Sequence, residues 1–102
     1  MYALTPGYRY ALASLEGSEP QTLQFIEKVP AIAGNGTLVT INDGTTNEEV
    51  LLVLLDRITF LNAKFPSPEN AAAIEHLAGA LLLLKKRTAD RQARGVEGRA
   101  TK

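Results

Sequence analysis

Apolar and polar positions alternate in the first part of the chain and recur every three to four residues in the second part. Tyr8, Tyr10 and Leu12 alternate with Arg, Ala and Ala, as in an extended segment with one apolar face. Two more runs of β-favouring residues follow, at 22–29 and 37–41, and a Gly-Asn-Gly sequence between them suits a turn. The pattern predicts an antiparallel β meander.

The rest of the chain follows the period of an α-helix. Thr46 and Glu49 have the spacing of a capping box, which predicts a helix that starts near Asn47. Two neighbouring apolar stripes run along this helix and indicate two packing partners. Their members are Leu51, Leu54, Leu55, Ile58, Leu61 and Phe65 in one stripe, and Val50, Val53, Phe60 and the stem of Lys64 in the other.

A second helix is predicted from Pro68 to about Arg94. Ser67 can cap it, Pro68 suits the first helical position, and Gly95 offers a left-handed stop. The connection is short, so the two helices should form an antiparallel hairpin over 46–94. The second helix would be about 40 Å long and the first about 27 Å.

The predicted fold class is α+β: a small N-terminal antiparallel β-sheet over 1–41, then the long helical hairpin. At 102 residues the chain has room for one domain, predicted over 1–98, with 99–102 as a flexible tail. The run Leu81–Leu84 points leucines in four directions around a helix, so no single partner face can cover it. Large exposed apolar patches usually mark interfaces, which predicts a homo-oligomer.

The charges are balanced overall but unevenly distributed. The chain has 11 basic and 11 acidic residues; positions 1–84 carry 4 basic and 9 acidic, a net of −5, and positions 85–102 carry 7 and 2, a net of +5. Arg87, Arg91 and Arg94 form one helical stripe in the basic part. One interpretation is a solvated face at the negative helix end, with Asp90 pairing a neighbouring Arg. The other is an anion site, because guanidinium groups grip phosphate bidentately.

Phe60 and Asn70 flank the predicted helical turn, whereas Arg87 and Arg91 lie at the far end of the hairpin. Phe60 also suits a core position, and Asn70 suits an ordinary helix start. Within one protomer the four side chains can hardly meet. In an oligomer with antiparallel hairpins, the Arg pair of a neighbour would come beside this Phe and Asn. An aromatic ring, an amide and two cations together suit a nucleotide with its base and phosphates.

Several kinds of chemistry are excluded by composition. The chain has no Cys and one His, so a thiolate metal site and a convincing nucleophile–base pair are missing, and we expect no metal, no cofactor and no catalysis. The longest apolar run, Val50–Leu55, is six residues long, and the N-terminus lacks the pattern of a secretory leader. The sequence predicts a soluble intracellular binding protein without a membrane partner.

Five segments carry a resemblance to a known family. They are 5–10 (TPGYRY), 21–28 (QTLQFIEK), 42–50 (NDGTTNEEV), 60–70 (FLNAKFPSPEN) and 87–98 (RTADRQARGVEG). These segments resemble phage Thoeris anti-defence 1 proteins, which share a helical-hairpin domain with the phage anti-CBASS protein 2 family. The resemblance implies a non-enzymatic sponge, in the cytoplasm of the infected bacterium, that sequesters cyclic nucleotide immune signals.

The resemblance also implies roles for four residues. Phe60 would stack on the adenine of a glycocyclic ADP-ribose, Asn70 would hydrogen-bond the ligand, and Arg87 and Arg91 would hold its pyrophosphate between subunits. Relatives assemble as hexamers built from three dimers, and some bind CBASS cyclic oligonucleotides at separate sites. The alternative is a small oligomeric nucleic-acid-binding or structural phage protein that uses the basic C-terminal end. The net charge of −5 over 1–84 argues against nucleic acid.

Overall fold

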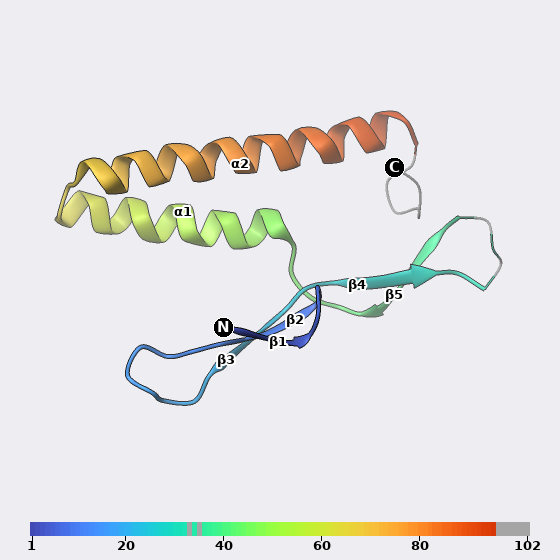
Figure 1. Cartoon of the computed structure of the whole chain (residues 1–102). Coiled ribbons are helices and arrows are strands. Elements are labelled where there is room, and N and C mark those ends of the chain that lie inside the picture. The colour runs from blue at the N-terminus through green and yellow to red at the C-terminus, as the bar shows by residue number, and fades with distance from the viewer. Residues whose placement is uncertain (33, 35, 96–102) are drawn as a thin grey trace. The chain divides into compact units, whose positions relative to one another are not determined.

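The structure, a computed structural model, describes residues 1–32, 34 and 36–95. In this part of the chain a β unit ends at Thr46 and a helical unit begins at Asn47 (Figure 1). The α+β class, with a small antiparallel N-terminal sheet followed by a helical hairpin, is confirmed. The single domain over 1–98 stays a prediction, and the predicted tail at 99–102 lies outside the described residues.

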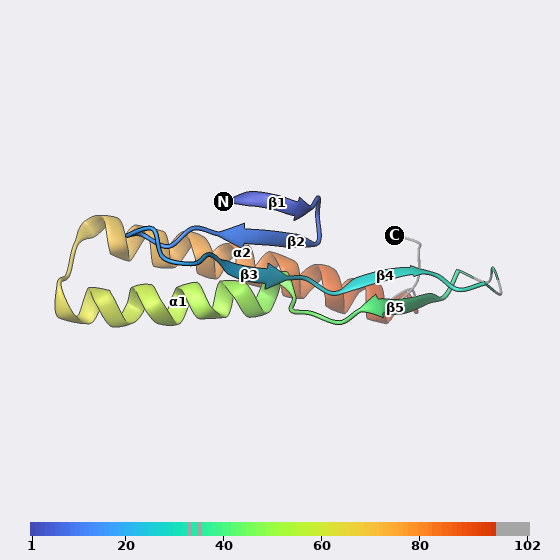
Figure 2. The ribbon, with the colours of Figure 1, turned by 90° about the horizontal axis from the view of Figure 1, so that it is seen from below.

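The β unit contains two small antiparallel sheets in place of one continuous meander (Figure 2). The first has the order β1-β2-β3, and the second pairs β4 with β5. The strands are β1 (Tyr2–Thr5), β2 (Arg9–Leu12), β3 (Gln21–Gln24), β4 (Glu27–Pro30) and β5 (Leu38–Asn42). Each neighbouring pair is therefore a hairpin between strands that are consecutive in the chain.

Strand β1 and its turn were not predicted. The Pro-Gly pair forms a tight turn in which Gly7 has a φ of 85° and the amide of Tyr8 donates to the carbonyl of Thr5 at 2.9 Å. A glycine at positive φ after a proline is typical of a type II turn. The prediction that Tyr8 lies within a strand is therefore wrong, because the turn holds it. Tyr10 does lie in β2, and its ring meets that of Phe25 edge to face at 6.0 Å.

The second predicted run is divided between β3 and β4 because another segment of the chain crosses it. The amide of Thr45 donates to the carbonyl of Gln24 at 2.8 Å, and the amide of Ile26 donates to the carbonyl of Thr45 at 3.0 Å. Gly44 makes this approach possible: a Cβ there would lie 2.6 Å from both the Gln24 oxygen and the Phe25 carbonyl carbon. The crossing ends one strand pairing and starts the next.

Helices α1 (Asn47–Lys64) and α2 (Pro68–Ala93) begin and end where the sequence predicts. Ser67 has extended backbone angles, and its hydroxyl accepts the amide of Asn70 at 3.0 Å, so it is an N-cap. Gly95 follows the helix with a φ of 73°, the left-handed conformation that ends many helices. The start and the end of α2 are therefore both set by residues next to them in the chain.

The two helices pack side by side as an antiparallel hairpin (Figure 1). Leu81 is buried in the described part of the chain, and the rest of the apolar seam is half-buried. Leu54 and Phe65, predicted to face a partner, are exposed; Phe65 lies beyond the last residue of α1. Large apolar side chains remain exposed on both helices: Leu52, Val53, Leu54, Phe60, Leu82 and Leu83.

The N-cap of α2 gives a first testable prediction. Ser67→Ala removes the acceptor for the Asn70 amide and should lower the free energy of unfolding by about 1 kcal/mol. Thermal unfolding followed by circular dichroism measures the change. Ser67→Asp keeps a capping oxygen and should unfold close to the unmodified protein. Equal melting temperatures for all three proteins would show that the cap contributes nothing.

Candidate anion-binding site

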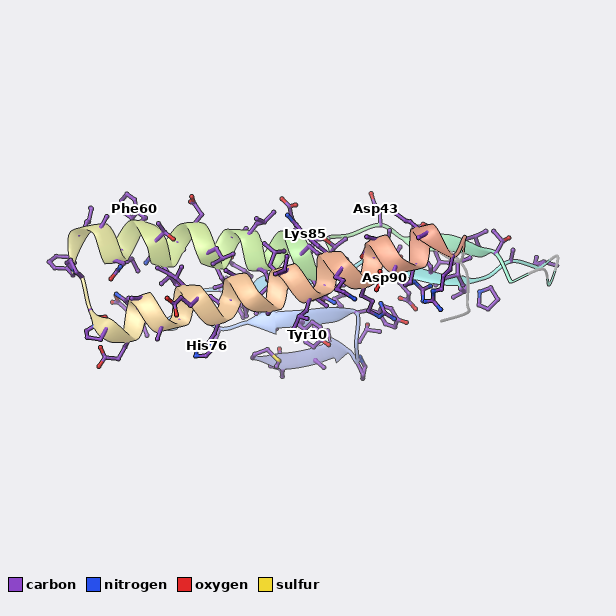
Figure 3. All side chains as sticks on the ribbon, turned by 90° about the horizontal axis from the view of Figure 1, so that it is seen from above. Tyr10, Asp43, Phe60, His76, Lys85 and Asp90 are labelled. Carbon is purple, nitrogen blue, oxygen red and sulfur yellow. The ribbon has the colours of Figure 1, made fainter. Side chains whose placement is uncertain are left out.

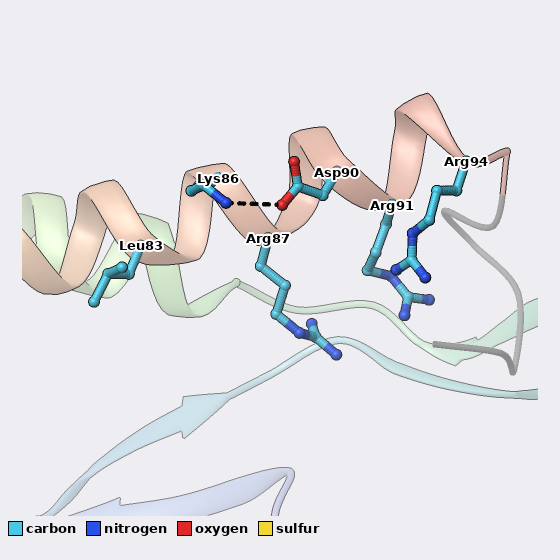
Figure 4. Close-up of a pocket in the computed structure, with 6 residues that line it drawn as sticks. All are labelled: Leu83, Lys86, Arg87, Asp90, Arg91 and Arg94. Carbon is cyan, nitrogen blue, oxygen red and sulfur yellow. Dashed lines mark hydrogen bonds and ion pairs between the residues drawn. The ribbon is translucent and has the colours of Figure 1, made fainter.

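The basic end of α2 presents two predicted site residues on one face. Arg87 and Arg91 are four residues apart, and Arg94 follows as the C-cap residue. Side chains at this spacing are neighbours on a helix surface, with Cβ atoms about 5–6 Å apart. Figure 4 shows the three guanidinium groups extending on the same side of α2. The stripe expected from the sequence is therefore present in the structure.

These side chains border an open hollow of about 500 Å³. Its lining residues all come from the end of α2: Leu83, Lys86, Arg87, Asp90, Arg91 and Arg94. They comprise four cations, one carboxylate and one apolar side chain. With their ordinary charges they sum to +3, so the hollow attracts compact anions with more than one negative charge. Leu83 adds an apolar surface beside the cations.

Asp90 pairs with a lysine and not with an arginine of the stripe. The Nζ of Lys86 lies 3.2 Å from the Oδ2 of Asp90, and Figure 4 marks no other ion pair among the six lining residues. The sequence interpretation in which Asp90 pairs with a neighbouring Arg is therefore not what the structure shows. Arg87 and Asp90 point to different sides of the helix in the same view.

The Arg pair lies on a part of α2 that extends beyond α1. With 18 and 26 residues, the helices are about 27 Å and 39 Å long. Because they share one turn, α2 extends past the first residue of α1 (Figure 1). At 1.5 Å per residue the extension is about 12 Å. Arg87 and Arg91 fall on this overhang, where α1 no longer lies beside the helix.

Phe60 lies on the surface of α1 with 55% of its area exposed. It borders a second hollow of about 440 Å³ together with Leu52, Val53, Asp56 and Arg57. The Nζ of Lys64 lies 4.8 Å from the centroid of the Phe60 ring, a cation–π contact. The interpretation of Phe60 as a core residue is therefore wrong for the described chain. An exposed ring suits stacking against a ligand or contact with a second copy.

Asn70 is half-buried in the first turn of α2. Phe60 lies near the same end of the hairpin, where α1 ends and α2 begins (Figure 3). The backbone amide of Asn70 is used by the Ser67 cap. Seventeen residues of continuous helix separate it from Arg87, which corresponds to about 26 Å along the axis. The structure thus brings Arg87 and Arg91 together and keeps Phe60 and Asn70 apart from them. Their convergence between two copies stays a prediction.

Sequence reasoning missed Lys86, and it placed the stem of Lys64 beside Phe60 without predicting a cation–π contact. Lys86 contacts Asp90 in one hollow, and Lys64 contacts the Phe60 ring beside the other. Both pairs have the i, i+4 spacing that places side chains on one helix face. That spacing was the available signal. Among the described residues, no group of three or more His, Cys, Asp or Glu side chains is placed to hold a metal ion.

Fold and site together define a small α+β protein whose helical hairpin presents clustered cations at one end. No family model matches the chain. It is 40% identical over 75 residues to Thoeris anti-defense 1 of Bacillus phage SBSphiJ7, a match that covers 62% of this chain. The match covers 53% of that relative, so the chain spans about half of its length. This similarity confirms the resemblance to the Thoeris anti-defence 1 family that the sequence motifs indicate.

In the part of the chain that the structure describes, no helix combines the length and the apolar character needed to cross a membrane.

Proposed function

We propose that the chain is a phage anti-defence protein that binds and sequesters a cyclic nucleotide immune signal, glycocyclic ADP-ribose, without degrading it. The name of the Bacillus phage relative supports the anti-defence role. The observation that carries the ligand class is the pair Arg87 and Arg91, side by side in one cationic hollow. CBASS cyclic oligonucleotides are a second ligand class with the same phosphate chemistry.

The cationic hollow suits a small anion better than a nucleic acid. Two guanidinium groups one helical turn apart match the spacing of adjoining phosphates and can hold each one through two parallel hydrogen bonds. A polynucleotide is long enough to approach the rest of the chain as well, and the net charge of −5 over residues 1–84 would repel its backbone. A pyrophosphate needs only the few cations of the α2 end.

A complete ligand site would require two copies of the chain. Arg87 and Arg91 can hold phosphates, but Asn70 lies about 26 Å from Arg87 along α2, and the exposed ring of Phe60 lies near the same far end of the hairpin. An antiparallel second copy would bring its Arg pair to this Phe60. Leu82 and Leu83, 69% and 68% exposed, supply apolar surface for such an interface. We therefore expect a homo-oligomer built from dimers, with a hexamer of three dimers as the larger assembly.

Mixing two inactive variants tests the shared site. Phe60→Ala and Arg87→Ala should each bind glycocyclic ADP-ribose poorly. If each site takes Phe60 from one copy and Arg87 from the other, a mixed dimer has one site with both substitutions and one with neither. After the variants are unfolded and refolded together, random pairing should return about a quarter of the sites at full affinity. Isothermal titration calorimetry counts them.

The matched control for this experiment is the double variant Phe60→Ala/Arg87→Ala mixed with unmodified protein. In the mixed dimer of this control, each site carries one of the two substitutions. Unmodified sites occur only in dimers of two unmodified chains. Recovery above the sum of the two separately refolded single variants supports a site between subunits. No recovery, with oligomers of normal size, would show that Phe60 of one copy and Arg87 of the other do not form one site.

Sequestration also predicts that the ligand survives. Glycocyclic ADP-ribose incubated with the protein and then released by heat denaturation should return chemically intact, because binding without turnover is the proposed mechanism. Liquid chromatography with mass spectrometry identifies the released species. Protein that had been heat-denatured beforehand controls for spontaneous decay. A new product that appears only with native protein would make the chain an enzyme.

A further inference from the structure

Lys86 and Asp90 form an ion pair in the middle of the cationic end of α2. The Nζ of Lys86 lies 3.2 Å from Oδ2 of Asp90, and the two side chains are 71% and 58% exposed. Arg87 is three residues before Asp90 and Arg94 four residues after it. Since residues three and four apart face each other on a helix, the carboxylate has several cations within its reach.

The geometry shows which of these cations holds the carboxylate. Lys86 reaches along the helix to Asp90, whereas the guanidinium of Arg87 extends away from Asp90 on the other side of α2 (Figure 4). A carboxylate next to an anion site competes with the incoming anion for the same guanidinium donors. An arriving phosphate would have to displace Asp90 from Arg87 if those two were paired.

We propose that Lys86 is a positioning residue for the anion site: it holds Asp90 so that Arg87 keeps its guanidinium for the ligand. The inference rests on the proposed function, in which Arg87 binds a phosphate of the ligand. Lys86 then acts in two ways, through its own positive charge and through Asp90. Because the ion pair is exposed, the effect on affinity should be a few-fold and not an abolition of binding.

A double-mutant cycle with inorganic pyrophosphate separates the two ways. Lys86→Met keeps the apolar stem without the charge, and Asp90→Asn keeps the shape without the carboxylate. We expect Lys86→Met to weaken pyrophosphate binding by about threefold when Asp90 is present. In the Asp90→Asn background the same substitution should change the affinity by clearly less, because no carboxylate is left to turn toward Arg87. An NMR titration that follows the arginine Nε–H signals measures both values.

Lys85→Met is the matched control, since it removes the same charge one residue earlier. Lys85 is five residues from Asp90 and off its face of the helix, so its loss should leave the pyrophosphate affinity nearly unchanged. Circular dichroism on every variant checks that α2 is intact. An equal loss in both backgrounds would show that Lys86 acts only through its own charge and would overturn the proposal, as would no loss in either.

The probe keeps this proposal distinct from the sponge function. Pyrophosphate reports on the cations of α2 whether or not glycocyclic ADP-ribose is the natural ligand. If Lys86 and Asp90 are coupled in the double-mutant cycle but the protein does not bind glycocyclic ADP-ribose, the role of Lys86 stands and the sponge function is rejected. Tight binding of glycocyclic ADP-ribose, together with a double-mutant cycle in which the two substitutions act independently, would support the sponge and reject the role of Lys86. Pyrophosphate that leaves the arginine signals of the unmodified protein unchanged would reject both.

Discussion

Arg87→Ala is expected to lower the affinity for glycocyclic ADP-ribose by about tenfold to a hundredfold. A hydrogen bond to a charged group contributes about 1.5–3 kcal/mol, and this guanidinium would face a phosphate in a hollow lined by further cations. Arg87→Lys should recover only part of the loss, because an ammonium group keeps the charge but cannot form two parallel hydrogen bonds to phosphate. Isothermal titration calorimetry measures both changes.

Lys85→Ala supplies the control for the loss of one positive charge near the same helix end. It lies outside the group of side chains that line the hollow, so its affinity should stay close to that of the unmodified protein. If Arg87→Ala and Lys85→Ala weaken binding equally, the site depends on general charge and not on the Arg pair. An unchanged affinity of Arg87→Ala would remove this residue from the site.

Gly44→Ala should give the largest loss of stability of any single methyl addition considered for this fold. The new Cβ would lie 2.6 Å from backbone atoms of Gln24 and Phe25, and neither can move as a flexible side chain would. The segment must separate from its partner, which disturbs the hydrogen bonds that Thr45 makes with Gln24 and Ile26. Forced overpacking of this kind costs about 1–3 kcal/mol or more.

Gly79→Ala adds the same methyl group but is expected to raise the stability of the protein. A Cβ at Gly79 meets nothing within 4 Å, and the residue lies inside α2. Alanine is favoured over glycine within a helix by about 0.8–1 kcal/mol, so this variant should unfold at a higher temperature. Thermal unfolding of both variants beside the unmodified protein makes the comparison. A Gly44→Ala protein as stable as the unmodified one would refute the close crossing.

The helical half of the fold follows from the sequence because its signals are local. Ser67 caps α2 through a hydroxyl three residues from the amide it accepts, and Gly95 ends the same helix by its own backbone conformation. The hydrophobic period then places the two helices against each other. Each of these signals is contained within a few consecutive residues, so reading along the chain is enough to find them.

The strands were harder to predict because their ends depend on distant segments. The division between β3 and β4 arises where Thr45 crosses residues about twenty positions earlier. No residue within the 22–29 run indicates this division. Strand β1 has a local signal, the Pro-Gly turn with Gly7 at positive φ, which the alternation of apolar and polar residues does not reveal. The end of β3 thus depends on a distant segment, whereas the start of β2 depends on a turn within the neighbouring residues.

The candidate site divides in the same way. The i, i+4 spacing of Arg87 and Arg91 predicts that they share a face, and they line one hollow. Whether Phe60 would be covered by its own chain could not be read from a helical period, because an apolar stripe looks the same against α2 or against another copy. The structure leaves that ring exposed. The hydrophobic pattern of one chain does not show which side chains of a second protomer would contact it.

The overhang of α2 links recognition to the order of the helix itself. The last turns of a helix fray most readily, and here they have no support from α1 while carrying several like charges that repel one another. An anion held by Arg87 and Arg91 would neutralise that repulsion and tie two successive turns together. Capture of the ligand and stabilisation of the free helix end would then be a single thermodynamic event, and part of the binding free energy would be spent on ordering the helix.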